Sequence, residues 1–272
     1  MFKEITGKIV YKNCHPDGDL LIVDSFNHRY LYLGSDAIQS GMDLRQPLRL
    51  VVAYTQVMMS FLLLHPKPQR ILLAGLGGGS LLKFLHHHFP EALIDVTEIR
   101  ADIIETAYRF FQLPHHPNIT IHLCDSRDYL NQQLTQAAAY DLMFIDAYDY
   151  GGIAPSVANQ HFFDLCHHHL DSRGVLVANI WSSNDTRFET LLGHLSTSFD
   201  RQILRLPVPE RGNVIVLACP YPLNVKQLKQ LAPQAQQLET DYHLPFSRYL
   251  NDLIKHNPHN WLQRWLLQHP MG

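Results

Sequence analysis

From residue 70 to residue 180 the sequence alternates short apolar runs with stretches of helical periodicity, and this alternation limits the fold more than any other feature. Strands that alternate with helices form βαβ units, which build a parallel sheet with helices on both faces. The apolar runs lie at 70–75, 93–98, 119–125, 141–146 and 174–180. A later apolar run at 213–219 predicts one or two antiparallel strands at the sheet edge. The sequence therefore predicts an α/β fold.

Residues 1–48 have a different pattern, in which β-type alternation is interrupted by turn sequences such as HPDGD. We predict a small antiparallel sheet of about three strands here, followed by a larger domain over residues 49–272. The uncharged segment 50–64 is shorter than the ~20 residues of a membrane span, so we predict a buried helix. The larger domain is predicted to end in a polar helical tail from residue 221 onward.

Composition excludes several classes of protein. The chain is 46% hydrophobic and 17% charged, with a net charge of −3 and no basic block, so no nucleic-acid partner is expected. The N-terminus lacks an apolar leader, and the four cysteines lack CxxC spacing. We therefore expect a cytoplasmic protein without a membrane partner. Consecutive histidines at 86–88 and 167–169 would point in three directions on a helix, so we expect exposed side chains and no metal site.

The residues at the strand ends indicate a nucleoside site, because ligands of open α/β sheets bind beyond the carboxyl ends of the strands. Gly75, Gly77 and Gly79 follow the first strand and would let the backbone turn tightly beside a ligand. Glu98 ends the second strand, where a carboxylate can accept hydrogen bonds from ribose hydroxyls. Asp125 ends the third strand and could accept from an adenine amino group, although each acid alone could also be a turn or N-cap residue.

The glycine pattern favours S-adenosylmethionine over a dinucleotide. Dinucleotide folds use G-x-G-x-x-G/A, and here Ser80 takes the third small position. The pattern G-x-G-x-G is the form found in folds that bind S-adenosylmethionine. Together with the acids at the strand ends, it predicts an adenosine-shaped slot.

These residues resemble the spermidine synthase (polyamine aminopropyltransferase) family, and the likeness extends to about residue 220. It is carried by AIQS, Tyr54, GLGGGS, TEI, CDSRDYL and IDAYDYGGIAP. The resemblance implies a Rossmann-like S-adenosylmethionine-dependent methyltransferase fold and a homodimer. It also implies transfer of an aminopropyl group from decarboxylated S-adenosylmethionine to a polyamine or another amine acceptor.

By that resemblance the cofactor-binding residues would be Gln39, Gly75, Gly77, Gly79, Glu98, Asp125 and Asp146. The reaction would depend on Tyr54, Asp146 and Asp149. A polyamine is protonated near pH 7, because the pKa of an alkylamine resembles the value of about 10.4 for lysine. It must lose a proton before it attacks a sulfonium carbon. One carboxylate can accept that proton while a second holds the cation.

The chain departs from the family pattern where the family handles the amine. Gly78 replaces an aspartate, Gln56 follows Tyr54-Thr55 without the expected acid, Pro209 replaces a tyrosine and Tyr150 replaces a proline. Three alternatives therefore remain open. The chain could be an aminopropyltransferase, a methyltransferase that uses intact S-adenosylmethionine, or a non-catalytic binding protein on the same fold. The aspartate pair favours an enzyme, and the missing acid at Gly78 favours the methyltransferase.

Overall fold

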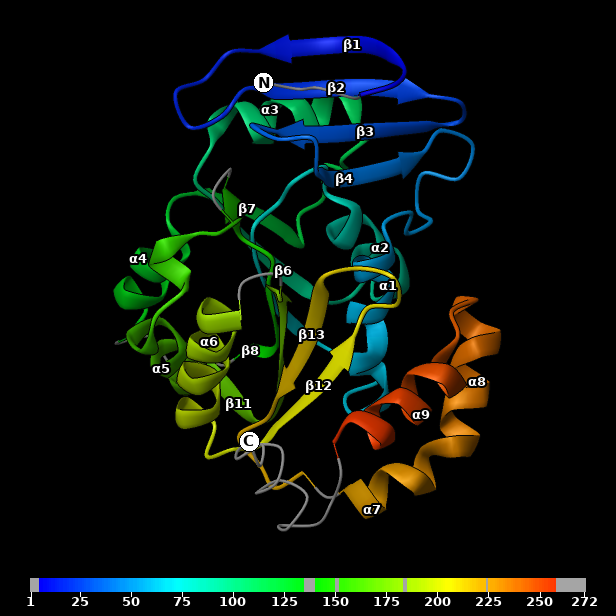
Figure 1. The fold of residues 1–272 in the computed structure, drawn as a ribbon, viewed down its shortest axis with the longest axis vertical. Helices are drawn as coiled ribbons and strands as arrows, with labels where there is room; N and C mark the ends of the chain where they lie inside the picture. Colours follow the sequence, from blue (N-terminus) through cyan, green and yellow to red (C-terminus); the bar gives the residue numbers. More distant parts are fainter. Residues whose placement is uncertain (1–4, 135–139, 150–151, 183–184, 224, 258–272) are drawn as a thin grey trace.

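The structure, a computed structural model, describes residues 5–134, 140–149, 152–182, 185–223 and 225–257 (Figure 1). Its centre is a seven-stranded sheet with the strand order β12-β13-β11-β8-β5-β6-β7. The strands are β5 (Arg70–Ala74), β6 (Leu93–Glu98), β7 (Ile119–Leu123), β8 (Tyr140–Ile145), β11 (Leu170–Trp181), β12 (Ile203–Pro207) and β13 (Asn213–Ala218). Five neighbouring strands, from β11 to β7, are joined by parallel pairing, and β13 pairs antiparallel with both β11 and β12. The predicted Rossmann-like methyltransferase fold is confirmed.

Helices cover both faces of this sheet, because each central strand is apolar on both sides. Leu73 belongs to the core on one face, whereas its neighbours Leu72 and Ala74 belong to the core on the other. Figure 1 shows α4, α5 and α6 on one side and α1, α8 and α9 on the other. The helices and 3-10 turns are α1 (Ala53–Met58), η1 (Met59–Leu63), α2 (Ser80–His88), α3 (Ala101–Phe110), α4 (Ser126–Gln132), η2 (Pro155–Val157), α5 (Gln160–His169), α6 (Asp185–Ser198), α7 (Val225–Leu228), η3 (Lys229–Leu231), α8 (Ala232–Tyr242) and α9 (Phe246–His256).

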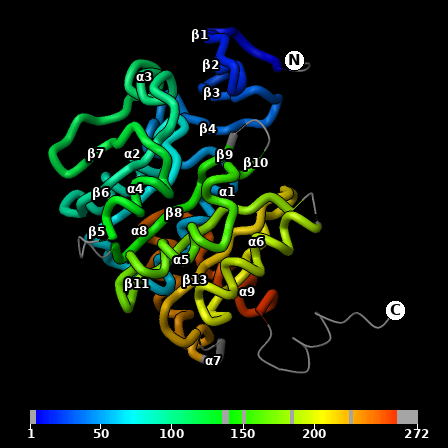
Figure 2. Tube along the Cα trace, turned by 90° about the vertical axis from the view of Figure 1, so that its left-hand side faces the viewer, coloured from blue at the N-terminus to red at the C-terminus, as the bar shows by residue number. Residues whose placement is uncertain are grey.

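The N-terminal segment forms a four-stranded antiparallel sheet, one strand more than we predicted. Its strands are β1 (Lys8–Asn13), β2 (Leu20–Ser25), β3 (His28–Leu33) and β4 (Ile38–Asp43), paired in that order. Figures 1 and 2 place this sheet beyond one end of the seven-stranded sheet. Its inner residues Leu20, Ile22 and Leu31 share one continuous core with α2 and α3. The division of the chain at residue 48 stays a prediction.

The apolar segment 50–64 folds as α1 followed directly by η1, and it is buried as predicted. Met58, Met59 and Phe61 are each 0% exposed. Within the described ranges, no helix has both the length and the apolar character that crossing a membrane requires. The tail contains α7, α8 and α9, and residues 258–272 lie outside the described part of the chain.

The two histidine runs end α2 and α5. His87 and His168 are exposed, as expected, but the prediction is wrong for His169, which is buried. Its Nε2 lies 3.0 Å from the carbonyl oxygen of Leu130. Among the residues that the structure describes, no group of three or more His, Cys, Asp or Glu side chains is placed to hold a metal ion.

Candidate active site

A cavity of about 1500 Å³ lies at the carboxyl ends of the parallel strands, under the loops of the N-terminal sheet. This is where an open α/β sheet binds its ligand. Typical small-molecule pockets have about 300–1,000 Å³, so this cavity has room for two reactants. The predicted site residues that line it are Gln39, Tyr54, Gly75, Gly77, Glu98, Asp125 and Asp146.

The three glycines of the first loop have different tasks. Each has positive φ, namely +101° at Gly75, +53° at Gly77 and +70° at Gly79. A Cβ at Gly75 would collide with the carbonyl oxygen of Asp146, so this glycine lets the ends of β5 and β8 approach closely. Gly77 borders the cavity. Gly79 is absent from the cavity lining, and a Cβ there would collide with Leu113, so the structure places it in the packing of α2.

Gly78, which stands where the related family has an acid, is also absent from the cavity lining. A Cβ at this position would lie 2.8 Å from Ser40 Oγ and 2.9 Å from Phe111 Cδ1. An aspartate here would have to displace one of these side chains. The substitution Gly78→Asp would therefore change the packing as well as add a negative charge.

Glu98 is 8% exposed at the end of β6, and backbone amides hold both of its carboxylate oxygens. Oε2 accepts from the backbone N–H of Leu76 at 3.1 Å, and Oε1 accepts from that of Arg100 at 3.0 Å. Burial raises the pKa of Glu98, and these hydrogen bonds oppose the shift. Each oxygen has a second lone pair, so the carboxylate can still accept from a ligand.

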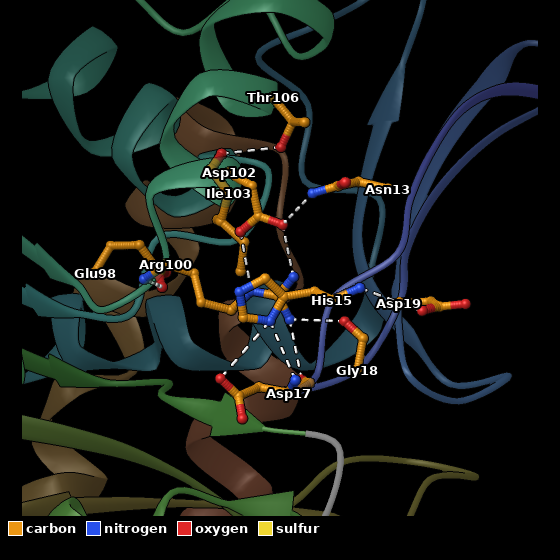
Figure 3. Close-up of polar contacts among 10 residues, drawn as sticks. All are labelled: Asn13, His15, Asp17, Gly18, Asp19, Glu98, Arg100, Asp102, Ile103 and Thr106. Carbon is orange, nitrogen blue, oxygen red and sulfur yellow. Dashed lines mark hydrogen bonds and ion pairs between the residues drawn. The ribbon is translucent and has the colours of Figure 1, made fainter.

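Arg100 connects the end of β6 to the loop between β1 and β2 (Figure 3). Its Nη1 donates to the carbonyl oxygens of Asp17 at 3.0 Å and Gly18 at 2.8 Å. Its Nε and Nη2 form a bidentate pair with Asp102 at 3.0 and 2.7 Å, and Asn13 Nδ2 also donates to that carboxylate at 3.0 Å. The N-terminal sheet is thereby fixed over one end of the cavity. Sequence reasoning missed this contact because its partners lie far apart in the chain.

Asp125 is the N-cap of α4, which was the structural alternative for this residue. Its Oδ1 accepts from the backbone N–H groups of Arg127 at 2.9 Å and Asp128 at 3.3 Å. The same residue lines the cavity. Since both of these bonds use Oδ1, capping leaves Oδ2 available for a ligand.

Asp146 follows β8 and accepts a side-chain hydrogen bond on each oxygen. Tyr54 Oη donates to Oδ2 at 3.0 Å, and Asn179 Nδ2 donates to Oδ1 at 2.9 Å. Burial raises the pKa of Asp146 to about 6, and the hydrogen bonds from Asn179 and Tyr54 oppose this rise. Tyr54 Oη also lies 3.1 Å from the backbone carbonyl oxygen of Gln39. Asp146 is thus mostly ionised at pH 7 and still basic enough to accept a proton.

Two buried side-chain amides, which sequence reasoning missed, orient Asp146. Asn179 in β11 is 2% exposed, and its Oδ1 accepts from Asn213 Nδ2 at 2.9 Å. This bond directs the Asn179 amide N–H toward Asp146. The available signal was an asparagine inside one apolar strand and another at the start of the next, because asparagine is depleted in strands.

The structure does not place the other residues singled out in the sequence, from Gln56 to Pro209, together in the cavity. Asp149 lies in β9 (Tyr148–Asp149), which pairs with β10 (Gly152–Ile153), but its side chain and all of Tyr150 lie outside the described residues. Gln56 Nε2 donates to the carbonyl oxygen of Leu50 at 2.8 Å and is absent from the cavity lining, as is the exposed Pro209.

Comparison with known proteins identifies the family. A sequence profile described as the spermine/spermidine synthase domain matches residues 52–208, more than half of the chain. The chain belongs to the spermine/spermidine synthase family. A polyamine aminopropyltransferase of Chromobacterium violaceum is 34% identical over 237 residues, which cover 87% of this chain and 89% of that protein. An eEF1A lysine and N-terminal methyltransferase of Mus musculus is 27% identical over 205 residues, or 71% of this chain and 29% of that protein.

Solved structures support the same fold for this family member. A probable spermidine synthase from Corynebacterium glutamicum has a TM-score of 0.71 at 18% identity and covers 96% of this chain and 99% of its own. A spermidine synthase in complex with the transition state analogue AdoDATO has a TM-score of 0.70 at 14% identity, with 96% and 87% covered. Human methyltransferase-like protein 13 in complex with SAH has a TM-score of 0.60 at 21% identity, with 81% and 100% covered.

Proposed function

We propose that this family member transfers an aminopropyl group from decarboxylated S-adenosylmethionine to a polyamine or another amine acceptor. The observation that carries the proposal is Asp146, a carboxylate with a pKa of about 6 held by Tyr54 and Asn179 in the same cavity as Glu98 and Asp125. The similarity to polyamine aminopropyltransferases adds support.

In this reaction Glu98 accepts from the ribose hydroxyls and Asp125 from the adenine amino group. The acceptor nitrogen attacks the aminopropyl carbon next to the sulfonium. A C–N bond forms, the C–S bond breaks, and methylthioadenosine leaves with the electron pair. Asp146 accepts the proton that the amine loses, and Tyr54 keeps the carboxylate in position. Asp149 is proposed to hold the cationic acceptor.

The alternative function is methyl transfer from intact S-adenosylmethionine. Gly78 removes an acid that would repel the methionine carboxylate, and one of the relatives is a methyltransferase. A non-catalytic binding protein is the third possibility, and it would bind nucleosides without turnover.

Calorimetry distinguishes these functions when S-adenosylmethionine, its decarboxylated form and methylthioadenosine are compared, followed by a product assay with putrescine. Tighter binding of the decarboxylated form and release of methylthioadenosine are expected. Preference for intact S-adenosylmethionine with release of S-adenosylhomocysteine would favour the methyltransferase, and binding without any product would favour the third possibility.

Asp125→Asn is expected to weaken methylthioadenosine by about tenfold without lowering the melting temperature. Asparagine is as good an N-cap as aspartate, so α4 keeps its cap through the amide oxygen. The amide NH2 then replaces the free carboxylate oxygen and faces the donor groups of adenine. Calorimetry and a thermal melt measure the two effects separately. Equal affinity in both proteins would limit Asp125 to its capping role.

Asn179→Ala is expected to move the acid limb of the pH–rate profile above pH 6. Activity requires ionised Asp146, so the rate rises as pH passes through the pKa of that carboxyl, about 6 in the native chain. Asn179 donates a hydrogen bond to the ionised form, and its removal therefore raises the pKa. The pH profile of kcat/KM is measured for the native chain and the variant with the same acceptor. The titration of the amine is then the same in both profiles, so a difference between them comes from the protein. An unmoved limb would contradict the assignment of Asp146.

The proposal extends to a homodimer, a cytoplasmic location, and a division into residues 1–48 and 49–272. Sedimentation of the purified chain tests the first, and limited proteolysis tests the last.

A further inference from the structure

The cavity has two halves. Gly75, Glu98 and Asp125 follow β5, β6 and β7 and form the half proposed for the nucleoside. The other half lies beyond the ends of β8 and β11 and at the start of β13, which runs antiparallel to β11. It is where the acceptor must bind. Its described lining includes Trp181 and Arg211.

The turn that carries Arg211 is fixed against the end of β11. Its backbone N–H donates to the carbonyl oxygen of Val208 at 3.2 Å. The carbonyl oxygen of the next residue, Gly212, accepts from Ser182 N at 2.7 Å and from Ser182 Oγ at 2.9 Å. A Cβ at Gly212 would lie 3.1 Å from the ring of Trp181, so the turn packs against that indole. Arg211 therefore projects from a defined backbone.

The same turn leads into the amides that orient Asp146. Asn213, two residues after Arg211, donates to Asn179 Oδ1, and Asn179 donates to Asp146 Oδ1, both at 2.9 Å. An acceptor whose nitrogen lies at Asp146 would extend along this row toward Arg211, since the ends of β8 and β11 and the start of β13 lie side by side at one sheet edge.

Arg211 places a positive charge in the lining of this half. Within the described part of the chain, Arg211 forms no ion pair, and both oxygens of Asp146 already accept hydrogen bonds. A guanidinium presents a planar fork of donors that matches a carboxylate, whereas it repels the far ammonium of a diamine.

We propose that Arg211, in the turn whose Gly212 packs against Trp181, forms a carboxylate subsite at the acceptor end of the cavity. The proposal rests on the proposed function and narrows its acceptor to an amine that also carries a carboxylate, such as an ω-amino acid. The bond changes are those of aminopropyl transfer, and the product is an N-aminopropyl amino acid. Intact S-adenosylmethionine also offers a carboxylate, and the test separates these two sources.

The test compares putrescine with 4-aminobutyrate, which has the same carbon chain with one amine replaced by a carboxylate. Calorimetry uses the full chain saturated with methylthioadenosine, as the native protein, Arg211→Met and the control Arg173→Met. Arg173 is an exposed arginine of β11 outside the cavity lining. The native chain is expected to bind 4-aminobutyrate more tightly. Arg211→Met should weaken it by about tenfold or more, leave putrescine no weaker, and match the control in its melting temperature.

Two further measurements are made: calorimetry with intact and decarboxylated S-adenosylmethionine, and a product assay with each acceptor. The first shows whether the bound carboxylate belongs to the acceptor or the cofactor, and the second tests the proposed function separately from the subsite. If Arg211→Met instead weakens intact S-adenosylmethionine and spares the decarboxylated form, the subsite is supported and its carboxylate belongs to the cofactor. If Arg211→Met changes no carboxylate ligand, the subsite is overturned, even where putrescine is turned over and aminopropyl transfer stands. Arg211-dependent binding of 4-aminobutyrate without product from any acceptor would support the subsite and contradict the proposed function. Should Arg211→Met fail to fold, Arg211→Gln serves in the same comparison.

Discussion

Asp146→Asn is expected to lower the turnover number by about 10²–10⁴-fold while the affinity for methylthioadenosine stays close to that of the native chain. Asparagine keeps the shape of the side chain but cannot accept a proton. Tyr54 and Asn179 both donate to this residue, so the amide NH2 must also face one of these donors. A turnover assay with the competent acceptor, calorimetry and a thermal melt measure the three quantities. Asp128→Asn, at an exposed acid on α4, is the matched control.

The competing view of Asp146 is that it caps the loop after β8, in which case asparagine would preserve activity. The contacts favour the catalytic view, because the partners of its carboxylate are the side chains of Tyr54 and Asn179. Full turnover in Asp146→Asn would remove the residue from the mechanism. Asp149→Asn, by contrast, is expected to raise KM for the acceptor more than it lowers kcat, since its proposed task is to hold a cation.

The fold could be predicted because its determinants are local. Each parallel strand is a short apolar run bounded by turn residues, and the predicted run at 93–98 coincides with β6. Strand ends in such a fold meet at one edge, so the sequence alone assigns Glu98, Asp125 and Asp146 to one cavity, and all three line it.

The supporting contacts could not be predicted in this way, because they join residues that are distant in sequence. Asn213 reaches Asp146 only through Asn179, and this path depends on the register of β13 against β11. Arg100 contacts a loop more than 80 residues earlier in the chain. No periodicity or spacing encodes either contact.

Single residues with two tasks also limit prediction from sequence. Asp125 was assigned either to a ligand or to a helix cap, and the structure shows that one oxygen serves the cap while the residue borders the cavity. The glycine pattern was assigned to a ligand as a whole, yet Gly79 packs against Leu113. A sequence motif therefore predicts where a site lies more reliably than it predicts the role of each residue in the motif.

Glu98→Ala is expected to weaken methylthioadenosine by at least tenfold. A hydrogen bond to a charged group contributes roughly 1.5–3 kcal/mol, and about 1.4 kcal/mol corresponds to a factor of ten in affinity. The substitution also leaves the buried N–H groups of Leu76 and Arg100 without their acceptor, which should lower the stability of the chain. Affinity is therefore measured by calorimetry well below the melting temperature, with Glu105→Ala on the exposed face of α3 as the control.

Glu98→Gln separates the loss of charge from the loss of packing. Glutamine fills the same space and keeps one acceptor oxygen, but its NH2 must face either the Leu76 or the Arg100 N–H. It should therefore weaken methylthioadenosine less than alanine does and more than the Glu105 control. If both Glu98 variants are folded and bind with native affinity, the ribose is held elsewhere and Glu98 only orders the glycine loop. A graded loss from the native chain through glutamine to alanine instead requires the carboxylate to contact the ligand, because the loop contacts alone would change the melting temperature and spare the affinity.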